Sequence, residues 1–360
     1  MRLNPSRPIT KQAFGLCVLL LLLILCVMIN MVHGPANISL NQLSGILANQ
    51  FVAMFDLELL NTDHINIRPW MNNVILDVRM PRIIIGIFAG ACLAICGAVM
   101  QGMFRNPLAS PSVLGVSAGA SLGAVIALYS GLAAITVWAL PTFAFIGSAI
   151  TLFVVYRIAS HRGQTTIGTL LLAGVALGAL NSAASSMILA LSLNNWDVGK
   201  TIVYWTMGGI EARTWDHVLL ILPFAVSGIS LLLFYARDLD AMLLGETHAA
   251  SIGVSVDQVR RKLLVITALL VGATVSVCGA IGFVGLVVPH IMRLMLGPHH
   301  RYLLPASALG GAITLVGADL LLRWAFTDRA IPLGVATASL GAPFFLFLLI
   351  KKDWASKASI

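Results

Sequence analysis

The sequence predicts an all-α membrane protein that crosses the bilayer ten times. Two features of the composition lead to this fold class: the 360 residues are 59% hydrophobic, and only 10% are charged. A soluble domain carries about 25% charged residues. The third observation is that the apolar residues gather in runs, and about 20 apolar residues cross a bilayer as a helix. We therefore expect a polytopic bundle.

The ten apolar runs are candidate transmembrane spans. The first follows Arg2, Arg7 and Lys11 and is longer than the apolar core of a signal peptide. No small-residue cleavage site follows it, so we expect it to be retained. The eighth is too short to cross alone and is expected to be a half-helix packed inside the protein. The runs are 14–32, 83–104, 111–130, 134–156, 167–191, 216–236, 263–282, 285–296, 303–324 and 333–350.

A polar break separates the second span from the third. It reads Arg105-Asn106-Pro107-Leu108-Ala109-Ser110-Pro111 and joins a run rich in small residues to the glycine-rich run ending at Ala120. Irregular backbone of this kind cannot face lipid, so it must lie at the membrane surface, against protein or along a water-filled path. The small residues before it let neighbouring helices approach closely.

The two halves of the chain share an internal repeat. The segment Gly90–Ala98 aligns with Gly272–Ala280, and the same offset pairs Pro107 with Pro289. Five crossings separate the two copies, an odd number, so the copies point in opposite directions. Spans 2–5 and 7–10 therefore form an inverted repeat, which is typical of transporters with a central path.

The distribution of basic residues predicts the orientation. An even number of spans places both termini on one side, and most of the 22 Lys and Arg residues fall on that side. The richer side is cytoplasmic. Arg79, Arg82 and Arg323 then lie at the outer surface, where they either snorkel at the interface or pair with acidic groups of an outside partner.

The chain shows no energy-converting site of its own. A P-loop needs Gly-x4-Gly-Lys-Ser/Thr, and the nearest match, at Gly199-Lys200-Thr201, has Asn194 in place of the first glycine. Asp319 is the clear acid within a span, as either a proton relay or a structural hydrogen-bonding group, of which the second is favoured. We expect the power source to be another subunit.

The longest inside loop, 237–262, is the natural contact for that subunit. Gly245 and Gly253 divide it into two short predicted helices. It is either a solvated or interfacial connector or a docking element, and its length among short loops favours docking. The apolar residues that share its helix faces are Leu244, Ala249, Ile252 and Val256.

Other chemistries are not indicated. The five cysteines all lie in apolar spans, where they pack as small apolar groups. The longest basic run is Arg260-Arg261-Lys262, which argues against nucleic-acid binding. Histidines such as His290 and His300 are better explained as interfacial or hydrogen-bonded residues, and we expect no metal site.

Several motifs between residues 79 and 352 resemble one known family. The motifs are Arg79-Met80-Pro81-Arg82, Gly97-Ala98-Val99-Met100-Gln101, the polar break at 105–111, Leu114-Gly115-Val116-Ser117-Ala118-Gly119-Ala120, 172–178, 204–209, 282–290, Gly317-Ala318-Asp319, 331–335 and Gly341-Ala342-Pro343-Phe344. Together they resemble the permeases of ABC importers for iron-siderophores, haem and vitamin B12. Within that family, the chain is most similar to the haem permease subunits.

The resemblance implies a subunit without a catalytic site of its own, in a bacterial inner membrane. Two copies would surround a shared path, two cytoplasmic ATPase subunits would bind ATP and Mg, and a periplasmic binding protein would deliver haem as cargo. Apolar walls with few polar groups suit a large, mostly apolar ring. A ferric siderophore or, less favoured, vitamin B12 is the alternative cargo. An ion-coupled carrier is the alternative from another class.

The resemblance also assigns roles to residues by matching position. Arg79, Arg82 and Arg323 correspond to the arginines that meet acidic residues of the binding protein. Asn106 and Leu108 fall on the cytoplasmic gate. Thr166 and Thr169 fall on a second gate element, where the sequence departs from the vitamin B12 permease pattern. The residues implied in ATPase coupling are Leu243, Leu244, Gly245, Glu246, Ala249, Ala250 and Gly253.

Overall fold

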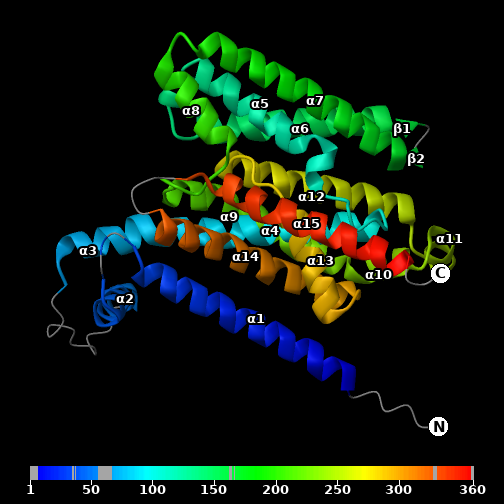
Figure 1. Ribbon diagram of the computed structural model, residues 1–360, viewed down its shortest axis with the longest axis horizontal. Coiled ribbons are helices and arrows are strands. Elements are labelled where there is room, and N and C mark those ends of the chain that lie inside the picture. Colours follow the sequence, from blue (N-terminus) through cyan, green and yellow to red (C-terminus); the bar gives the residue numbers. More distant parts are fainter. Residues whose placement is uncertain are drawn as a thin grey trace.

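The computed structural model describes residues 7–34, 36, 38–55, 67–161, 164–165, 167–326 and 331–357. These residues form a helical bundle in which most helices run along the long axis of the molecule (Figure 1). The α-helices are α1 (Arg7–Val32), α2 (Leu40–Phe55), α3 (Pro69–Asn73), α4 (Met80–Met103), α5 (Val116–Tyr129), α6 (Ala139–Ala159), α7 (Ile167–Ser192), α8 (Trp196–Thr206), α9 (Trp215–Phe234), α10 (Ala236–Leu243), α11 (Glu246–Ser251), α12 (Val256–Cys278), α13 (Val284–Leu296), α14 (His300–Ala325) and α15 (Leu333–Lys357).

Shorter elements complete the described part of the chain. A π-helical segment, Val74–Arg79, leads directly into α4, and 3₁₀ turns occupy Pro111–Leu114 and Leu132–Ala134. Two-residue strands β1 (Ser160–His161) and β2 (Gln164–Thr165) pair antiparallel after α6.

A helix occupies each of the ten predicted apolar runs, in the predicted order. Seven helices are long and apolar enough to cross a membrane, and three shorter apolar helices complete the set among the described residues. One of the three is α13, the predicted half-helix, which packs against α4, α14 and α15. The seventh span differs at both ends: α12 begins at Val256 and ends at Cys278, because Gly279 has a φ of 67° and stops the helix.

Among the described α-helices of more than eight residues, two were not predicted, α2 and α8. Helix α2 carries five Asn, Gln or Ser residues among its 16, so it gives no span signal. Helix α8 carries Asp197 and Lys200 and is N-capped by Asn195, whose side chain accepts the Val198 amide hydrogen bond. Neither segment has an apolar run long enough to cross the bilayer.

Helix α4 is the centre of the fold, and it is buried over most of its length. Its glycines allow backbone-to-backbone packing: a Cβ built on Gly90 would lie 2.2 Å from the carbonyl oxygen of Gly311 on α14. A Cβ on Gly97 would lie 1.7 Å from the carbonyl oxygen of Gly285 on α13. Glycine is therefore required at both positions for this helix spacing.

The first helix of each half packs against helices of the other half, and this symmetry supports the repeat. The first helix of the first half, α4, packs on α13 and α14 of the second half. The first helix of the second half, α12, packs on α5 and α6 of the first half. Gly272 of α12, the repeat partner of Gly90, meets Ser148 of α6 as Gly90 meets Gly311 of α14.

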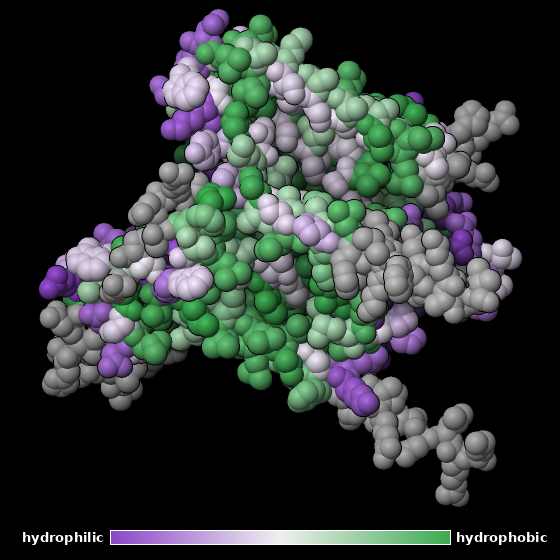
Figure 2. Space-filling view, viewed as in Figure 1, coloured by the Kyte–Doolittle hydropathy of each residue, from purple (hydrophilic) through white to green (hydrophobic). Residues whose placement is uncertain are grey.

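The two ends of the bundle differ. Both ends of the chain lie at the end that carries α10 and α11, whereas α2 and α3 lie at the opposite end (Figure 1). A hydrophobic surface covers the middle of the molecule, and hydrophilic residues gather towards the two ends (Figure 2). This division matches a protein whose middle faces lipid.

Candidate functional site

Side chains from two helices far apart in the sequence, α4 and α14, meet at the end of the bundle opposite the chain termini. Asp319 of α14 accepts hydrogen bonds from Arg82 of α4, with Nη2–Oδ1 and Nε–Oδ1 distances of 2.6 and 3.0 Å. Its other oxygen pairs with Nη2 of Arg323 at 3.1 Å. The Asp319 side chain is buried, so the two arginines supply the pairing that a carboxylate needs there.

Glu211 extends this cluster towards the surface. It lies in the turn between α8 and α9, and its carboxylate is 3.7 Å from Nη2 of Arg82. Burial raises the pKa of Glu211, and the nearby Arg82 opposes that rise. Arg82, Arg323, Asp319 and Glu211 together form what we call the arginine–aspartate cluster.

Arg79 has a different environment from the other two predicted docking arginines. It is only 4% exposed, and its guanidinium donates hydrogen bonds to the carbonyls of Met31, Val32 and Ala36. These contacts fix the chain that leaves α1. In this structure Arg79 therefore holds backbone, and its docking role stays a prediction.

The predicted gate residues lie in a turn that we call the gate turn, residues 105–111. Asn106 accepts the backbone N–H of Leu108 through its side-chain Oδ1 at 2.9 Å, and its own N–H donates to the carbonyl of Gln101 at 3.1 Å. Arg105 has a φ of 48°, in the left-handed region, which lets the chain reverse directly after α4. Leu108 is 46% exposed. The turn is thus an internally bonded unit with a projecting leucine.

The second predicted gate element is only partly described. Thr169 lies in the first turn of α7 and is exposed. Thr166 lies outside the described residues.

The predicted division of the 237–262 loop into two helices is confirmed. Helix α10 ends at Leu243 and α11 begins at Glu246, with Gly245 between them at a φ of 117°. Gly253 follows α11 at a φ of 92°. Only glycine adopts such angles readily, so both predicted punctuating glycines are required for the turns.

The surface of this helix pair differs in part from the expectation. Leu244 and Ile252 are 71% and 59% exposed, whereas Ala249 is fully buried against the core. Ala249 therefore packs inwards and is unavailable to a partner, which corrects its predicted place on a docking face. Leu243 is half-buried, and Ala250 is exposed.

Ion pairs and close packing hold the helix pair to the bundle. Glu246 pairs with Arg260 of α12 at 2.5 Å, and Asp257 pairs with the same guanidinium at 3.4 Å. A Cβ on Gly245 would lie 4.0 Å from Nη1 of Arg105. The turn between α10 and α11 therefore lies beside the first residue of the gate turn.

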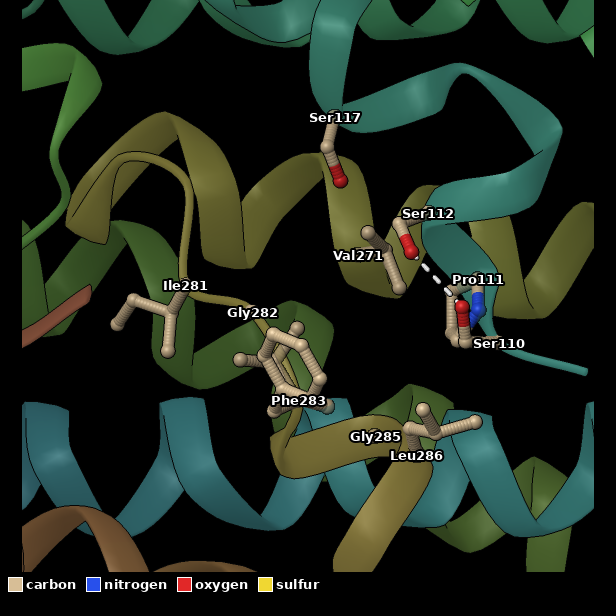
Figure 3. A pocket seen from close by; sticks show the side chains of 11 residues that line it. Ser110, Pro111, Ser112, Ser117, Val271, Ile281, Gly282, Phe283, Gly285 and Leu286 are labelled. Carbon is tan, nitrogen blue, oxygen red and sulfur yellow. Dashed lines mark hydrogen bonds between the residues drawn. The ribbon is translucent and has the colours of Figure 1, made fainter. Parts of the chain in front are cut away.

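One cavity adjoins the gate turn, and a second lies next to the first. One, of about 190 Å³, is lined by Ser110, Ser112 and Ser117 on one side and by residues 281–286 on the other (Figure 3). The next, of about 370 Å³, shares Ser117 and is lined by α5, α7 and α8. Its hydroxyl-bearing residues are Ser117, Ser121, Ser182, Ser185, Ser186 and Thr206. These hydroxyls add polar groups to walls that are otherwise apolar, as at Val125, Leu189 and Ile202.

A third cavity, of about 410 Å³, is apolar. It lies between α13, α14 and α15 and is lined by residues such as Val287, Ile291 and Leu340. No charged side chain lines any of these three cavities. An uncharged group bound in these cavities would therefore bury no charged side chain of the lining without a partner.

Several contacts here had no signal in the sequence. Arg82 and Asp319 lie 237 positions apart, and Asp240 bonds to His300 across 60 positions. Asp319 was expected to be a structural hydrogen-bonding group, and its pairs with Arg82 and Arg323 confirm that expectation. The identity of its partners required the fold.

Comparison with known proteins gives consistent matches along the chain. A family model described as the FecCD transport family matches residues 21–351. The cobalamin import system permease protein BtuC of Halobacterium salinarum is 46% identical over 280 residues, 78% of this chain and 74% of that protein. The Fe(3+)-citrate import system permease protein YfmD of Bacillus subtilis is 42% identical over 278 residues, 77% and 81% of the two chains.

A haem-linked relative and a solved structure extend the comparison. The hemin transport system permease protein HmuU of Yersinia pestis is 38% identical over 289 residues, 78% of this chain and 84% of that protein. An inward-facing metal-chelate type ABC transporter has a TM-score of 0.80 at 30% identity, covering 93% of this chain and 98% of that one. Relatives with three different named cargoes thus match at similar levels.

Proposed function

Because the chain belongs to the FecCD transport family, we propose that it is the membrane-spanning subunit of an ATP-driven importer, working as a pair of copies. It would conduct a metal chelate inwards without catalytic chemistry of its own. ATPase subunits would bind the α10–α11 helix pair, and a substrate-binding protein would dock at the arginine–aspartate cluster.

One observation carries this proposal: the α10–α11 turn lies within reach of the Arg105 side chain, at the start of the gate turn. Gly245 is next to Arg105, and the exposed Leu244 beside it offers an apolar anchor to a partner. A partner that pushes on this helix pair would therefore act directly on the residues that project Leu108. The same arrangement favours an import path whose cytoplasmic gate is opened and closed by a partner bound to the α10–α11 helix pair.

The orientation follows from the same arrangement. The helix pair and both chain ends lie at one end of the bundle (Figure 1), and the excess of basic residues assigns that end to the cytoplasm. The arginine–aspartate cluster then faces outwards. Arg82 and Arg323 would receive acidic side chains of the binding protein, with Arg79 in the supporting role of fixing the chain beneath them.

Haem is the proposed cargo, with cobalamin and ferric siderophores as the alternatives. The similarity to the Yersinia pestis hemin permease supports haem, and the relatives named for cobalamin and ferric citrate support the alternatives. Uncharged cavity walls suit an apolar macrocycle, and the hydroxyls suit polar groups at its edge.

A transport assay with the complete complex tests the proposal and ranks the cargoes. The subunit, its ATPase and its binding protein are reconstituted in liposomes, and ATP-dependent entry of haem, cobalamin and a ferric siderophore is compared. The proposal expects entry of at least one cargo that requires both partners, with haem fastest. Entry that proceeds without the ATPase would overturn it.

A further inference from the structure

A partly buried hydrogen-bonded pair, Asp240 and His300, connects the α10–α11 helix pair to the end of α4. His300, the first residue of α14, has no exposed surface. Its backbone N–H donates to Oδ1 of Asp240 on α10 at 2.8 Å, and its Nδ1 lies 2.8 Å from the same oxygen. Burial alone would raise the pKa of Asp240, but the hydrogen bonds from His300 hold that pKa below its ordinary value.

The other side of the His300 ring rests on α4. A Cβ built on Gly102 would lie 2.3 Å from Nε2 and 2.9 Å from Cε1 of the imidazole, so the ring occupies the space that a side chain would need. Nε2 is buried without a hydrogen-bond partner. The ring is therefore held by contact at Gly102 on one side and by Asp240 on the other.

Gly102 is in turn bonded to the gate turn. Its carbonyl accepts the N–H of Arg105 at 3.3 Å, and the preceding carbonyl, of Gln101, accepts the N–H of Asn106. The Gln101 side chain donates to the carbonyl of Leu286 at 3.0 Å, which ties the same turn of α4 to α13. Displacement of Gly102 must therefore move the gate turn as a unit.

We propose that the Asp240–His300 pair transmits movement of the α10–α11 helices to the gate turn through Gly102. Asp240 and His300 are positioning residues, and they need touch neither ATP nor cargo. A tightly packed ring between two helices passes on a displacement because interiors of this kind deform little. This inference rests on the proposed function, since it assumes an ATPase that moves α10.

The α10–α11 helix pair also approaches the gate turn at a second point, between Gly245 and Arg105, and this approach differs from the Asp240–His300 pair. Arg105 lies near Gly245 without a hydrogen bond to it, whereas Asp240 is bonded twice to His300. Substitution of Asp240 should therefore interrupt the transmission even though the turn at Gly245 remains in place.

The test measures ATP-driven movement at Leu108 in the complete complex. Leu108→Cys in a Cys17→Ser background reports through its rate of maleimide labelling, with and without ATP. In this background, Asp240→Ala should reduce the ATP-dependent change in labelling roughly tenfold while ATP hydrolysis continues. Asp240→Asn retains the accepting oxygen and should keep most of the response. Asp238→Ala, on the same helix, is the control and should keep all of it.

The outcomes distinguish the possible failures. An undiminished response in Asp240→Ala, with an intact response in the parent complex, would overturn the role of the pair and leave the proposed function standing. A parent complex that never responds to ATP would overturn both. If Asp240→Ala fails to assemble, His300→Asn decides: it keeps a donor for Asp240 but removes the ring from Gly102. A lost response then supports the pair, and a retained one overturns it.

Discussion

Arg82 and Asp319 form a 2.6 Å ion pair between α4 and α14, the two helices whose glycine-mediated contact lies at the centre of the fold. With Arg323 on the other carboxylate oxygen, this pair joins the first turn of α4 to the last turns of α14. It would also set the charge offered to the proposed docking partner, because the carboxylate neutralises part of the charge of the two arginines.

Neutralising Arg82 and Arg323 should weaken the proposed docking of the binding protein. Arg82→Gln with Arg323→Gln is preferable to charge reversal, which would place new carboxylates against Asp319. We expect affinity to fall roughly tenfold or more at low salt and less at high salt, because salt screens the attraction. Binding to nanodiscs at two salt concentrations measures this, with exposed Arg157→Gln on α6 as the control. If the double variant and the unsubstituted subunit bound the binding protein with equal affinity at low salt, the docking role would be contradicted.

Removing the carboxylate should destabilise the fold. Asp319→Asn leaves Arg82 and Arg323 without their buried counter-ion, and breaking such a pair costs roughly 3 kcal/mol. Unfolding in detergent should show a clearly lowered midpoint, whereas Asp197→Asn on the exposed side of α8 should leave it nearly unchanged. An unaltered midpoint for Asp319→Asn would mean that the cluster contributes little to stability.

A methyl group at the crossing of α4 and α14 should also destabilise the protein. Gly90→Ala places a Cβ 2.2 Å from the Gly311 carbonyl oxygen, so the helices must separate, at a cost of about 2 kcal/mol. Gly168→Ala, where no atom lies within 4 Å, is the matched control. Thermal unfolding of the two variants tests this, and equal stability would contradict the close packing.

The ion pair at the start of α11 should matter more for coupling than for stability. Glu246→Gln keeps an accepting oxygen but removes the charge of the 2.5 Å ion pair with Arg260, and this half-exposed pair contributes at most about 1 kcal/mol. We expect several-fold less cargo transported per ATP, with a nearly unchanged melting temperature. Asp257→Asn, which removes the longer 3.4 Å contact, should have the smaller effect. The reverse ranking would exclude Glu246 as the principal contact.

The sequence predicted the elements of the fold better than the contacts between them. Apolar runs depend on local composition, so the ten spans and the glycines at 245 and 253 could be found without the structure. Helix α8 was missed because Asp197 and Lys200 interrupt its apolar residues. The C-terminal end of α12 was misplaced because the sequence of an apolar run does not reveal that Gly279 has a positive φ.

The site was predicted only in part, for a physical reason. Motif matching named Arg79, Arg82 and Arg323 together, yet burial separates Arg79 from the other two. Whether an arginine faces water or a carbonyl depends on the neighbouring helix, here the end of α1. The Asp240–His300 pair depends in the same way on the packing of α10 against α14.

ATP-dependent uptake by reconstituted protein tests the central claim most directly. The account predicts that liposomes containing the subunit with its ATPase accumulate cargo only when ATP and the binding protein are both supplied on their respective sides. It predicts no accumulation by the subunit alone under a proton or sodium gradient. Cargo accumulation by the isolated subunit, driven by an ion gradient, would contradict the account.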